Sequence, residues 1–323
     1  MKIAATRRRY PLQTAFTISR GSRMDAEVIE VTITDGDLRG RGECVPSARY
    51  GETLSSVMNA IETLPIPIDR RSLQNLLPAG AARNAVDCAL WDLESRRQGA
   101  PVWQIAGLAE PDPVTTAITI SLDEPEKMTA QARQYASYPL MKVKLGGAGD
   151  QERIASVRMA APDARMIVDA NESWTLDMIR DRQEILEETG VEMIEQPLPA
   201  GQDQCLADID SVITLCADES CHDQASLERL ASCYGMINIK LDKTGGLTEA
   251  LALAAEARRR NLRVMVGSML GSSLAMAPAM LLAQAADIVD LDGPLYMVKD
   301  IDHGLLYESA WVSPPSAELW GGG

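Results

Sequence analysis

Basic residues are in the minority in this 323-residue chain. Lysine and arginine together number 31, against 46 aspartates and glutamates, so the formal net charge at neutral pH is -15. A surface with this charge repels a phosphate backbone over most of its area, which argues against nucleic acid as a partner.

Histidines and paired cysteines are also scarce. The two histidines are His222 and His303, and the six cysteines contain no CxxC pair and no regular spacing. Zinc sites use such spacings, and small disulfide frameworks belong to much shorter chains. The sequence therefore disfavours zinc and predicts reduced cysteines, as in a cytoplasmic protein.

Long apolar runs are rare. The stretch MKIAATRRRYPLQTAFTI lacks the apolar run of a secretory signal, so we expect no export. Residues 264–286 carry no charge, but they include glycines, serines, Pro278 and Gln284. A buried strand, a capped turn and a helix explain this stretch better than a membrane span does, so no membrane partner is expected.

Eight short apolar runs alternate with helical stretches from Val114 onward. They are TTAITIS, LMKVKL, RMIVDA, EMIEQP, ITLCADE, MINIKL, RVMVGS and DIVDLD. This alternation is typical of a parallel α/β barrel. Earlier in the chain, an alternating segment that turns at Asp35-Gly36 predicts an antiparallel hairpin, and a helix is expected to end at Gly99.

Polar residues close these runs at intervals of 22 to 27 residues, about the length of one strand, one helix and two loops. A doubly wound open sheet uses the same units. Acids and bases at the ends of successive strands favour a closed ring, because only a ring brings all strand ends toward one point. The residues are Lys144, Asp169, Glu195, Asp218, Lys240, Gly267 and Asp290.

Three carboxylates from neighbouring runs predict a metal site: Asp169 in IVDAN, Glu195 in IEQP and Asp218 in ADES. One acid alone would be read as a helix cap or a surface ion-pair partner. Three converging carboxylates repel one another unless a cation lies between them, and oxygen ligands suit Mg²⁺. Asn171 is either a polar partner of this metal site or a turn residue. Glu219 is expected to point the other way on a regular strand.

The stretch LMKVKLGG, residues 140–147, puts Lys142 and Lys144 on one face of a strand, an arrangement that needs an opposite charge nearby. Lys240 follows the acidic strands, so ammonium groups flank the predicted metal. A cation shifts a neighbouring lysine toward its neutral, basic form. Lysines on both sides of a carbon can remove and return its proton while Mg²⁺ stabilises an enediolate. Lys243 is the less favoured candidate for the role of Lys240, because it lies an odd number of positions after Lys240 and alternation would place it on the opposite face.

The eighth run ends in DLDGP, where Asp290 and Asp292 share a face. A polar strand end before a Gly-Pro turn is the alternative interpretation. Beside lysines and a metal, a carboxylate pair is suited to an ammonium group, and this predicts a substrate with a free amine.

Taken in order, KVK, IVDANESW, EQPLP, ADES and NIKLDKTGGL resemble the enolase superfamily, in its muconate-lactonising subgroup. DLDGP and GRGECVPSARYGET narrow the likeness to dipeptide epimerases. The resemblance implies a modified (β/α)7β barrel at residues 113–294, with an α+β capping domain formed by residues 1–112 and about 295–323. It also implies an Mg²⁺-dependent isomerase of murein peptide recycling, acting on a dipeptide such as L-Ala-L-Glu or L-Ala-D-Glu.

The same resemblance assigns roles to individual residues. Lys144 and Lys240 would be the acid/base catalysts, and Lys142 would assist in binding the carboxylate or enediolate. The metal ligands and the ammonium-binding pair would be those inferred above. In FTISRGSR, either Arg20 or Arg23 would bind a side-chain carboxylate of the substrate, and the alternative is that both are solvated.

Several alternatives remain open. A cycloisomerase or an o-succinylbenzoate synthase uses the same scaffold without an ammonium group in its substrate. An epimerase of other X-Glu or hydrophobic dipeptides, or a catalytically idle dipeptide-binding protein, is also consistent with the motifs. A homo-oligomer is possible on this sequence.

Overall fold

Three long antiparallel strands open the chain of this computed structural model, which describes residues 1–209 and 211–322. They are β1 (Lys2–Ile18), β2 (Gly21–Asp35) and β3 (Leu38–Cys44), in the order β1-β2-β3. Asp35 pairs with Leu38 across the turn, and Gly36 takes the positive φ of 59° that this tight turn requires. The predicted hairpin at Asp35-Gly36 is therefore confirmed.

A helical layer covers this sheet. It contains η1 (Ala48–Tyr50), α1 (Leu54–Glu62), α2 (Arg70–Leu76), α3 (Ala81–Gln98) and α4 (Val102–Ile105). As predicted, α3 ends before Gly99, which adopts a left-handed conformation with φ 61°. The helix packs directly on β3 at Gly42, where the backbones approach too closely for any side chain. A Cβ atom on Gly42 would lie 2.2 Å from the carbonyl oxygen of Ala85.

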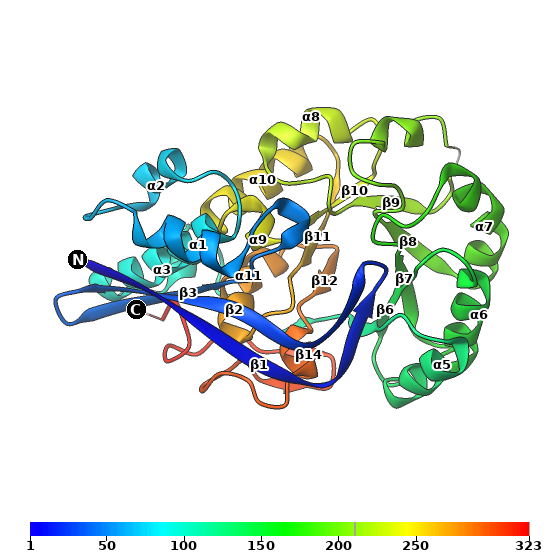
Figure 1. Ribbon diagram of the computed structural model, residues 1–323, viewed down its shortest axis with the longest axis horizontal. Helices are drawn as coiled ribbons and strands as arrows, with labels where there is room; N and C mark the ends of the chain where they lie inside the picture. The colour runs from blue at the N-terminus through cyan, green and yellow to red at the C-terminus, as the bar shows by residue number, and fades with distance from the viewer. Residues whose placement is uncertain (210, 323) are drawn as a thin grey trace.

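Eight parallel strands form the second region, at the right of Figure 1. In spatial order they are β5 (Ile118–Ile120), β6 (Leu140–Lys144), β7 (Arg165–Asp169), β8 (Val191–Glu195), β9 (Thr214–Ala217), β10 (Met236–Ile239), β11 (Arg263–Gly267) and β12 (Ile288–Asp290). Each coincides with one of the eight apolar runs. The connecting helices are α5 (Pro125–Gln134), α6 (Asp150–Ala160), α7 (Leu176–Glu188), η2 (Asp203–Leu206), η3 (Gln224–Ser226), α8 (Leu227–Leu230), α9 (Leu241–Thr244), α10 (Leu247–Arg259) and α11 (Ser273–Ala283).

Hydrogen bonds close the sheet beside its first and last strands. The amide of Ala117 donates to the carbonyl of Val289 at 2.8 Å, and the amide of Leu291 donates to Thr116 Oγ1 at 2.8 Å. A short turn, η4 (Gly293–Tyr296), follows β12 where an eighth barrel helix would otherwise begin. The predicted modified (β/α)7β barrel with an α+β cap is confirmed.

An apolar ring fills the barrel interior, with one residue from each strand or from the residue just before it. The ring explains the positions of the polar residues, because side chains two residues further along a strand point the same way. Lys142 thus follows Leu140, Asp169 follows Ile167 and Glu195 follows Met193. The ring consists of Ala117, Leu140, Ile167, Met193, Cys216, Met236, Met265 and Ile288.

The C-terminal segment runs back to the N-terminal region, and both chain ends lie on that side in Figure 1. On the way, β13 (Tyr307–Glu308) and β14 (Trp311–Val312) form a small sheet with β4 (Val114–Thr115). The indole of Trp320 then donates to the carbonyl of Cys88 in α3 at 3.0 Å. The domain limits predicted at 112/113 and near 295 stay predictions.

The uncharged stretch 264–286 forms most of β11 and all of α11, and Ser272 caps the helix by accepting from the amide of Leu274. Across the described residues, the structure contains no helix of the length and apolarity that a membrane span requires. All six cysteines are free thiols.

Candidate active site

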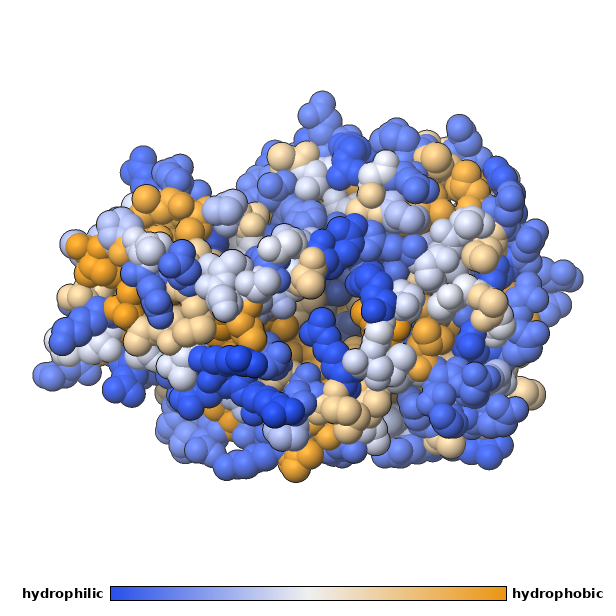
Figure 2. All heavy atoms as spheres, in the orientation of Figure 1, coloured by the Kyte–Doolittle hydropathy of each residue, from blue (hydrophilic) through white to orange (hydrophobic). Residues whose placement is uncertain are grey.

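A cavity of about 380 Å³ lies at the C-terminal ends of the barrel strands. The tip of the β1–β2 hairpin and the segment around η1 cover it, and Figure 2 shows a hollow near the centre of this face, bordered by hydrophilic residues. All of the predicted site residues line the cavity except Asp169 and Glu195. These two carboxylates are completely buried beside it.

The two lysines of LMKVKLGG are neutralised by carboxylates of neighbouring strands. Lys144 Nζ lies 2.6 Å from Asp169 Oδ2. Lys142 Nζ lies 2.7 Å from Glu195 Oε2 and 2.8 Å from Asp290 Oδ2. Opposite charges at these distances offset the desolvation of two buried ammonium groups on one strand face.

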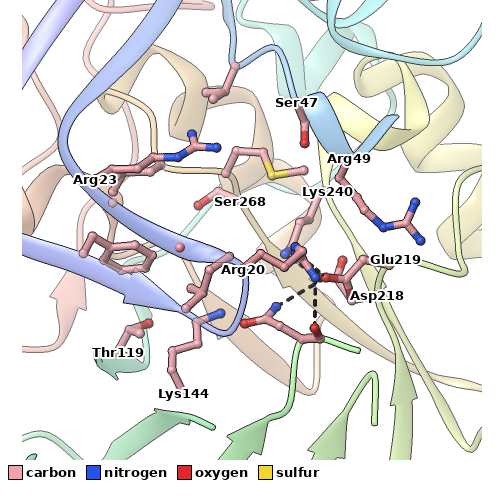
Figure 3. A pocket seen from close by; sticks show the side chains of 18 of the residues that line it. Arg20, Arg23, Ser47, Arg49, Thr119, Lys144, Asp218, Glu219, Lys240 and Ser268 are labelled. Atoms are coloured by element: carbon pink, nitrogen blue, oxygen red, sulfur yellow. Dashed lines mark hydrogen bonds and ion pairs between the residues drawn. The ribbon is translucent and has the colours of Figure 1, made fainter. Parts of the chain in front are cut away.

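Lys240 repeats this arrangement on the other side of the acidic strands. Its Nζ lies 2.6 Å from Asp218 Oδ2. In Figure 3, Lys144 and Lys240 approach the cavity from different sides, with Asp218 beside Lys240. Lys243 does not line the cavity: it is buried behind Asp218, 2.7 Å from Oδ1, and donates to the carbonyl of Asn238 at 2.9 Å.

Burial and the neighbouring ammonium groups have opposite effects on the pKa values of these carboxylates. Burial raises the pKa of Asp169, but the ammonium groups of Lys144 and Lys142 outweigh it and lower the pKa to about 2. Burial, followed by the charge of Asp169, raises the pKa of Glu195 to about 7. Although burial also opposes its ionisation, Asp218 has a pKa well below its usual range because of Lys240 and Lys243.

The same charges act on the lysines. Burial lowers the pKa of Lys240, but Asp218 outweighs it and the net pKa is raised. Burial likewise opposes the ammonium form of Lys142, yet Asp290 and Glu195 raise its pKa well above the usual range. A basic lysine at neutral pH therefore requires another cation to neutralise the carboxylates.

The donor set suits a hard divalent cation. The carboxylates of Asp169, Glu195 and Asp218 are buried together, and the partners of Glu195 Oε2 and Asp218 Oδ1 are ammonium groups, of Lys142 and Lys243 respectively, each at 2.7 Å. Oxygen atoms of this kind are the ligands that Mg²⁺ prefers. Within residues 1–209 and 211–322, the His, Cys, Asp and Glu side chains form no ready-made group of three that could hold a metal ion. Ammonium groups are the present partners of these carboxylates.

Asn171 and Glu219 adjoin this set. The Asn171 amide group donates from Nδ2 to Glu219 Oε1 at 3.3 Å, and its backbone N–H donates to Asp169 Oδ1 at 2.8 Å. The expectation that Glu219 points away is wrong: both Asp218 and Glu219 line the cavity. Strand β9 ends at Ala217, so strict alternation no longer applies to the residues after it.

Gln196 holds the loop that carries Asp218, a role that the sequence pattern does not predict. Its Oε1 accepts from the amides of Asp218 at 2.9 Å and Ser220 at 3.1 Å, and Nε2 donates to the carbonyl of Leu198 at 2.9 Å. In EQP, the sequence predicts a role only for the glutamate. The positive φ of 34° at Gln196 is a property of the folded backbone that a sequence pattern does not reveal.

The two arginines of the hairpin, Arg20 and Arg23, differ in their ion-pair partners. Arg20 lies 2.7 Å from Glu219 Oε1 and 3.1 Å from Glu172 Oε2, and Figure 3 shows it directed at the Asp218–Glu219 side of the cavity. Arg49 also binds Glu172, with two contacts of 2.6 Å. Arg23 lines the cavity on the other side, and it makes no ion pair with any residue that the structure describes.

The aspartates of DLDGP both reach the cavity. Asp290 Oδ2 accepts from Lys142, whereas Oδ1 is buried and accepts no hydrogen bond from any residue that the structure describes. Asp292 Oδ2 accepts from the amide of Thr119 and the hydroxyl of Tyr296, both at 2.7 Å. Burial, and then the charge of Asp290, raises the pKa of Asp292 to about 6.

This fold and site define a class of protein: a (β/α) barrel enzyme with an α+β cap. At the strand ends, lysines lie on both sides of a set of buried carboxylates. Family models match two parts of the chain. Residues 2–107 match the mandelate racemase / muconate lactonizing enzyme N-terminal domain, and residues 127–310 match the enolase C-terminal domain-like family. The chain therefore belongs to the enolase superfamily, and it is an isomerase.

Two relatives are 44% identical to the chain. One is an L-Ala-D/L-Glu epimerase of Escherichia coli, aligned over 92% of this chain and 95% of the relative. The other is an N-acetyl-D-glutamate racemase of a Pseudoalteromonas species, aligned over 91% of this chain and 95% of the relative.

Solved structures agree with this assignment. An enolase family member from Agrobacterium tumefaciens with homology to dipeptide epimerases, with sodium and L-Ala-L-Glu bound, superimposes with a TM-score of 0.97 at 49% identity, over 99% of both chains. A dipeptide epimerase from Methylococcus capsulatus, with Mg and L-Arg-D-Lys, gives 0.89 at 32% identity, over 100% of this chain and 98% of that one.

Proposed function

We propose that the chain epimerises the C-terminal residue of a dipeptide, L-Ala-L-Glu or L-Ala-D-Glu, by a Mg²⁺-dependent transfer of its α-proton. The observation that carries this proposal is the pair Lys144 and Lys240. The two lysines stand at the ends of β6 and β10, with the carboxylate strands β7, β8 and β9 between them. A carbon held between two such groups can lose a proton to one and regain it from the other.

Asp169, Glu195 and Asp218 would hold the Mg²⁺, with Asn171 fixing the Asp169 carboxylate through its backbone N–H. When bound, the ion would bind the substrate carboxylate and stabilise the enediolate. It would also neutralise the carboxylates that now keep Lys240 charged, so that a lysine can serve as the base. Lys142 would assist in binding the carboxylate or enediolate.

Asp290 and Asp292 would bind the α-ammonium group of the dipeptide. They lie two residues apart in a buried wall of the cavity, and Lys142 neutralises only one oxygen of Asp290. Arg23 would bind the side-chain carboxylate of glutamate, because Arg20 is already engaged by Glu172 and Glu219.

A second candidate is racemisation of an N-acylated amino acid, favoured by the Pseudoalteromonas relative at equal identity. Its substrate has no ammonium group, so it leaves Asp290 and Asp292 without a partner. The buried Oδ1 of Asp290, which has no hydrogen-bond partner within residues 1–209 and 211–322, supports the dipeptide instead.

We further propose that the enzyme acts in the cytoplasm in murein peptide recycling. Residues 1–112 with about 295–323 would form the cap, and residues 113–294 the barrel. Size-exclusion chromatography with light scattering would establish whether the chain forms a homo-oligomer.

The test is direct. Purified protein with Mg²⁺ is incubated with L-Ala-L-Glu, L-Ala-D-Glu, L-Ala-L-Leu and N-acetyl-L-glutamate, and the optical rotation of each mixture is followed. We expect rotation to change fastest for the glutamate dipeptides and to stop with excess EDTA. Faster turnover of N-acetylglutamate, or of Ala-Leu, would replace the proposed substrate.

A further inference from the structure

Tyr296 joins the carboxylate of Asp292 to the hairpin that covers the cavity. Its hydroxyl lies 2.7 Å from Asp292 Oδ2. Its ring packs edge-on against Phe16 of β1, with 5.4 Å between ring centroids. Phe16 itself lines the cavity, whereas Tyr296 is buried behind Asp292. Tyr296 therefore touches a cavity wall residue on each of two sides without lining the cavity itself.

The hydroxyl provides one of two donors to a single carboxylate oxygen. The other donor is the backbone amide of Thr119, also at 2.7 Å. The Thr119 amide also lies 2.9 Å from the hydroxyl oxygen, and the Thr119 carbonyl, at 2.9 Å, is a second acceptor for the single hydroxyl proton. The carboxylate is the nearer acceptor and the charged one, so it takes the stronger hydrogen bond. Donors at these distances favour the ionised carboxylate and restrict its rotation. They act against burial and the neighbouring Asp290, which favour the neutral form of Asp292.

The turn that carries Tyr296 is attached to β1 at several points. The amide of Val298 donates to the carbonyl of Pro11 at 2.9 Å, and Gln13 Nε2 donates to the carbonyl of Met297 at 2.9 Å. A β-bridge also joins Leu12 to Met297. The position of Tyr296 is thus set by the cap, while its hydroxyl acts on a residue that follows the last barrel strand.

We propose that Tyr296 is a positioning residue for recognition of the substrate's amino terminus. It holds Asp292 as a fixed anion that accepts a cationic ammonium group and disfavours an acylated nitrogen. This inference rests on the proposed dipeptide substrate and identifies how the cap contributes to its selection. The hydroxyl contacts Asp292 and the backbone of Thr119 and, among the residues that the structure describes, no lysine, so we expect it to act on binding and not on proton transfer.

The test is Tyr296→Phe, which keeps the ring and its packing on Phe16 and removes only the hydroxyl. Tyr307→Phe is the matched control, because the Tyr307 hydroxyl donates to the backbone carbonyl of Leu291 at 2.7 Å and not to a carboxylate. KM and kcat are measured for L-Ala-L-Glu. The inhibition constant of N-propionyl-L-glutamate, which has the same shape without the ammonium group, is measured in parallel.

We expect Tyr296→Phe to raise KM about tenfold, the effect of one hydrogen bond to a charged group, with kcat within about threefold of wild type. The inhibition constant of the propionyl compound should not change, and Tyr307→Phe should leave all three values near wild type. In the Asp292→Asn background, Tyr296→Phe should have no further effect on KM, because the two residues act as one unit.

Other outcomes overturn the inference. An unchanged KM, an equal rise of KM and of the propionyl inhibition constant, or the same change in Tyr307→Phe would show that the hydroxyl has a merely structural role. If wild-type protein turns over the dipeptide and Tyr296→Phe behaves like it, only this inference fails. If wild-type protein turns over no dipeptide at all, the proposed function fails and the inference falls with it.

Discussion

The ammonium nitrogen of Lys142 lies 2.8 Å from Asp290 Oδ2, a contact that joins β6 to β12 across the mouth of the barrel. Strand β5 lies between them, so the contact depends on closure of the sheet. Lys142 also contacts Glu195 at 2.7 Å. One lysine thereby links the proposed metal ligands to the proposed ammonium-binding pair.

The first prediction concerns that pair. Asp292→Asn removes the charge that we assign to ammonium binding, and Asp290→Asn additionally leaves Lys142 with one fewer anion. We expect kcat/KM for L-Ala-L-Glu to fall about 100-fold or more in each variant, as for the loss of a buried charge partner. Steady-state kinetics test this. Wild-type kcat/KM in both variants would show that the two aspartates do not bind the ammonium group of the dipeptide.

The second prediction separates the two hairpin arginines. Arg23→Ala should lower kcat/KM for L-Ala-L-Glu by about 10- to 100-fold and hardly affect L-Ala-L-Leu, because it removes the proposed partner of the side-chain carboxylate. Arg20→Ala should affect both dipeptides similarly, because Arg20 binds Glu172 and Glu219 of the protein itself. The ratio of kcat/KM between the two dipeptides is the measurement. A selective effect of Arg20→Ala would exchange the roles.

The third prediction concerns metal binding without reference to turnover. Mg²⁺ at about 100 times its dissociation constant should stabilise the fold by about 2.7 kcal/mol, which raises the melting temperature by several degrees. Asp218→Asn should abolish the shift, since it removes a proposed ligand. Calorimetry with Mg²⁺ or with EDTA measures it. Equal shifts in both proteins would place the ion elsewhere.

The fourth prediction is a pH dependence of stability caused by Glu43. Burial raises the pKa of Glu43 to about 8, although the hydroxyl and amide of Ser272 favour its ionised form. The unfolded chain ionises this residue near its usual pKa of about 4.3. Between these pH values the unfolded state binds fewer protons than the folded state, so stability falls as pH rises.

Glu43→Gln removes this dependence and retains an acceptor for the Ser272 amide. The free energy of unfolding of wild type, relative to Glu43→Gln, should decline between about pH 4.5 and pH 8, with a slope of up to about 1.4 kcal/mol per pH unit. Urea titrations at several pH values provide the data. A constant difference would mean that Glu43 is ionised in the folded protein throughout this range.

The barrel and the residues at its strand ends were predictable because they depend on local periodicity. Alternation along β6 placed Lys142 and Lys144 on one face, and the apolar ring beneath them confirms that this face is the barrel interior. The same rule failed at Glu219, because the residue lies beyond the end of β9 and its direction is set by a loop.

Contacts between segments that lie far apart in the chain could not be predicted from the sequence. The choice between Arg20 and Arg23 depends on Glu172 and Glu219, which approach the hairpin only in the folded chain. The hydroxyl of Tyr296 likewise meets Thr119, which precedes it by 177 residues. No spacing in the sequence encodes such a pair.

We propose that Lys144 and Lys240 act on opposite sides of the same carbon. The decisive measurement follows α-proton exchange in D₂O by NMR for Lys144→Ala and Lys240→Ala, each incubated with L-Ala-L-Glu and separately with L-Ala-D-Glu. We expect that neither variant epimerises, that each exchanges the α-proton of one epimer only, and that the two variants differ in which epimer. Epimerisation by either variant, or exchange of the same epimer by both, would contradict it.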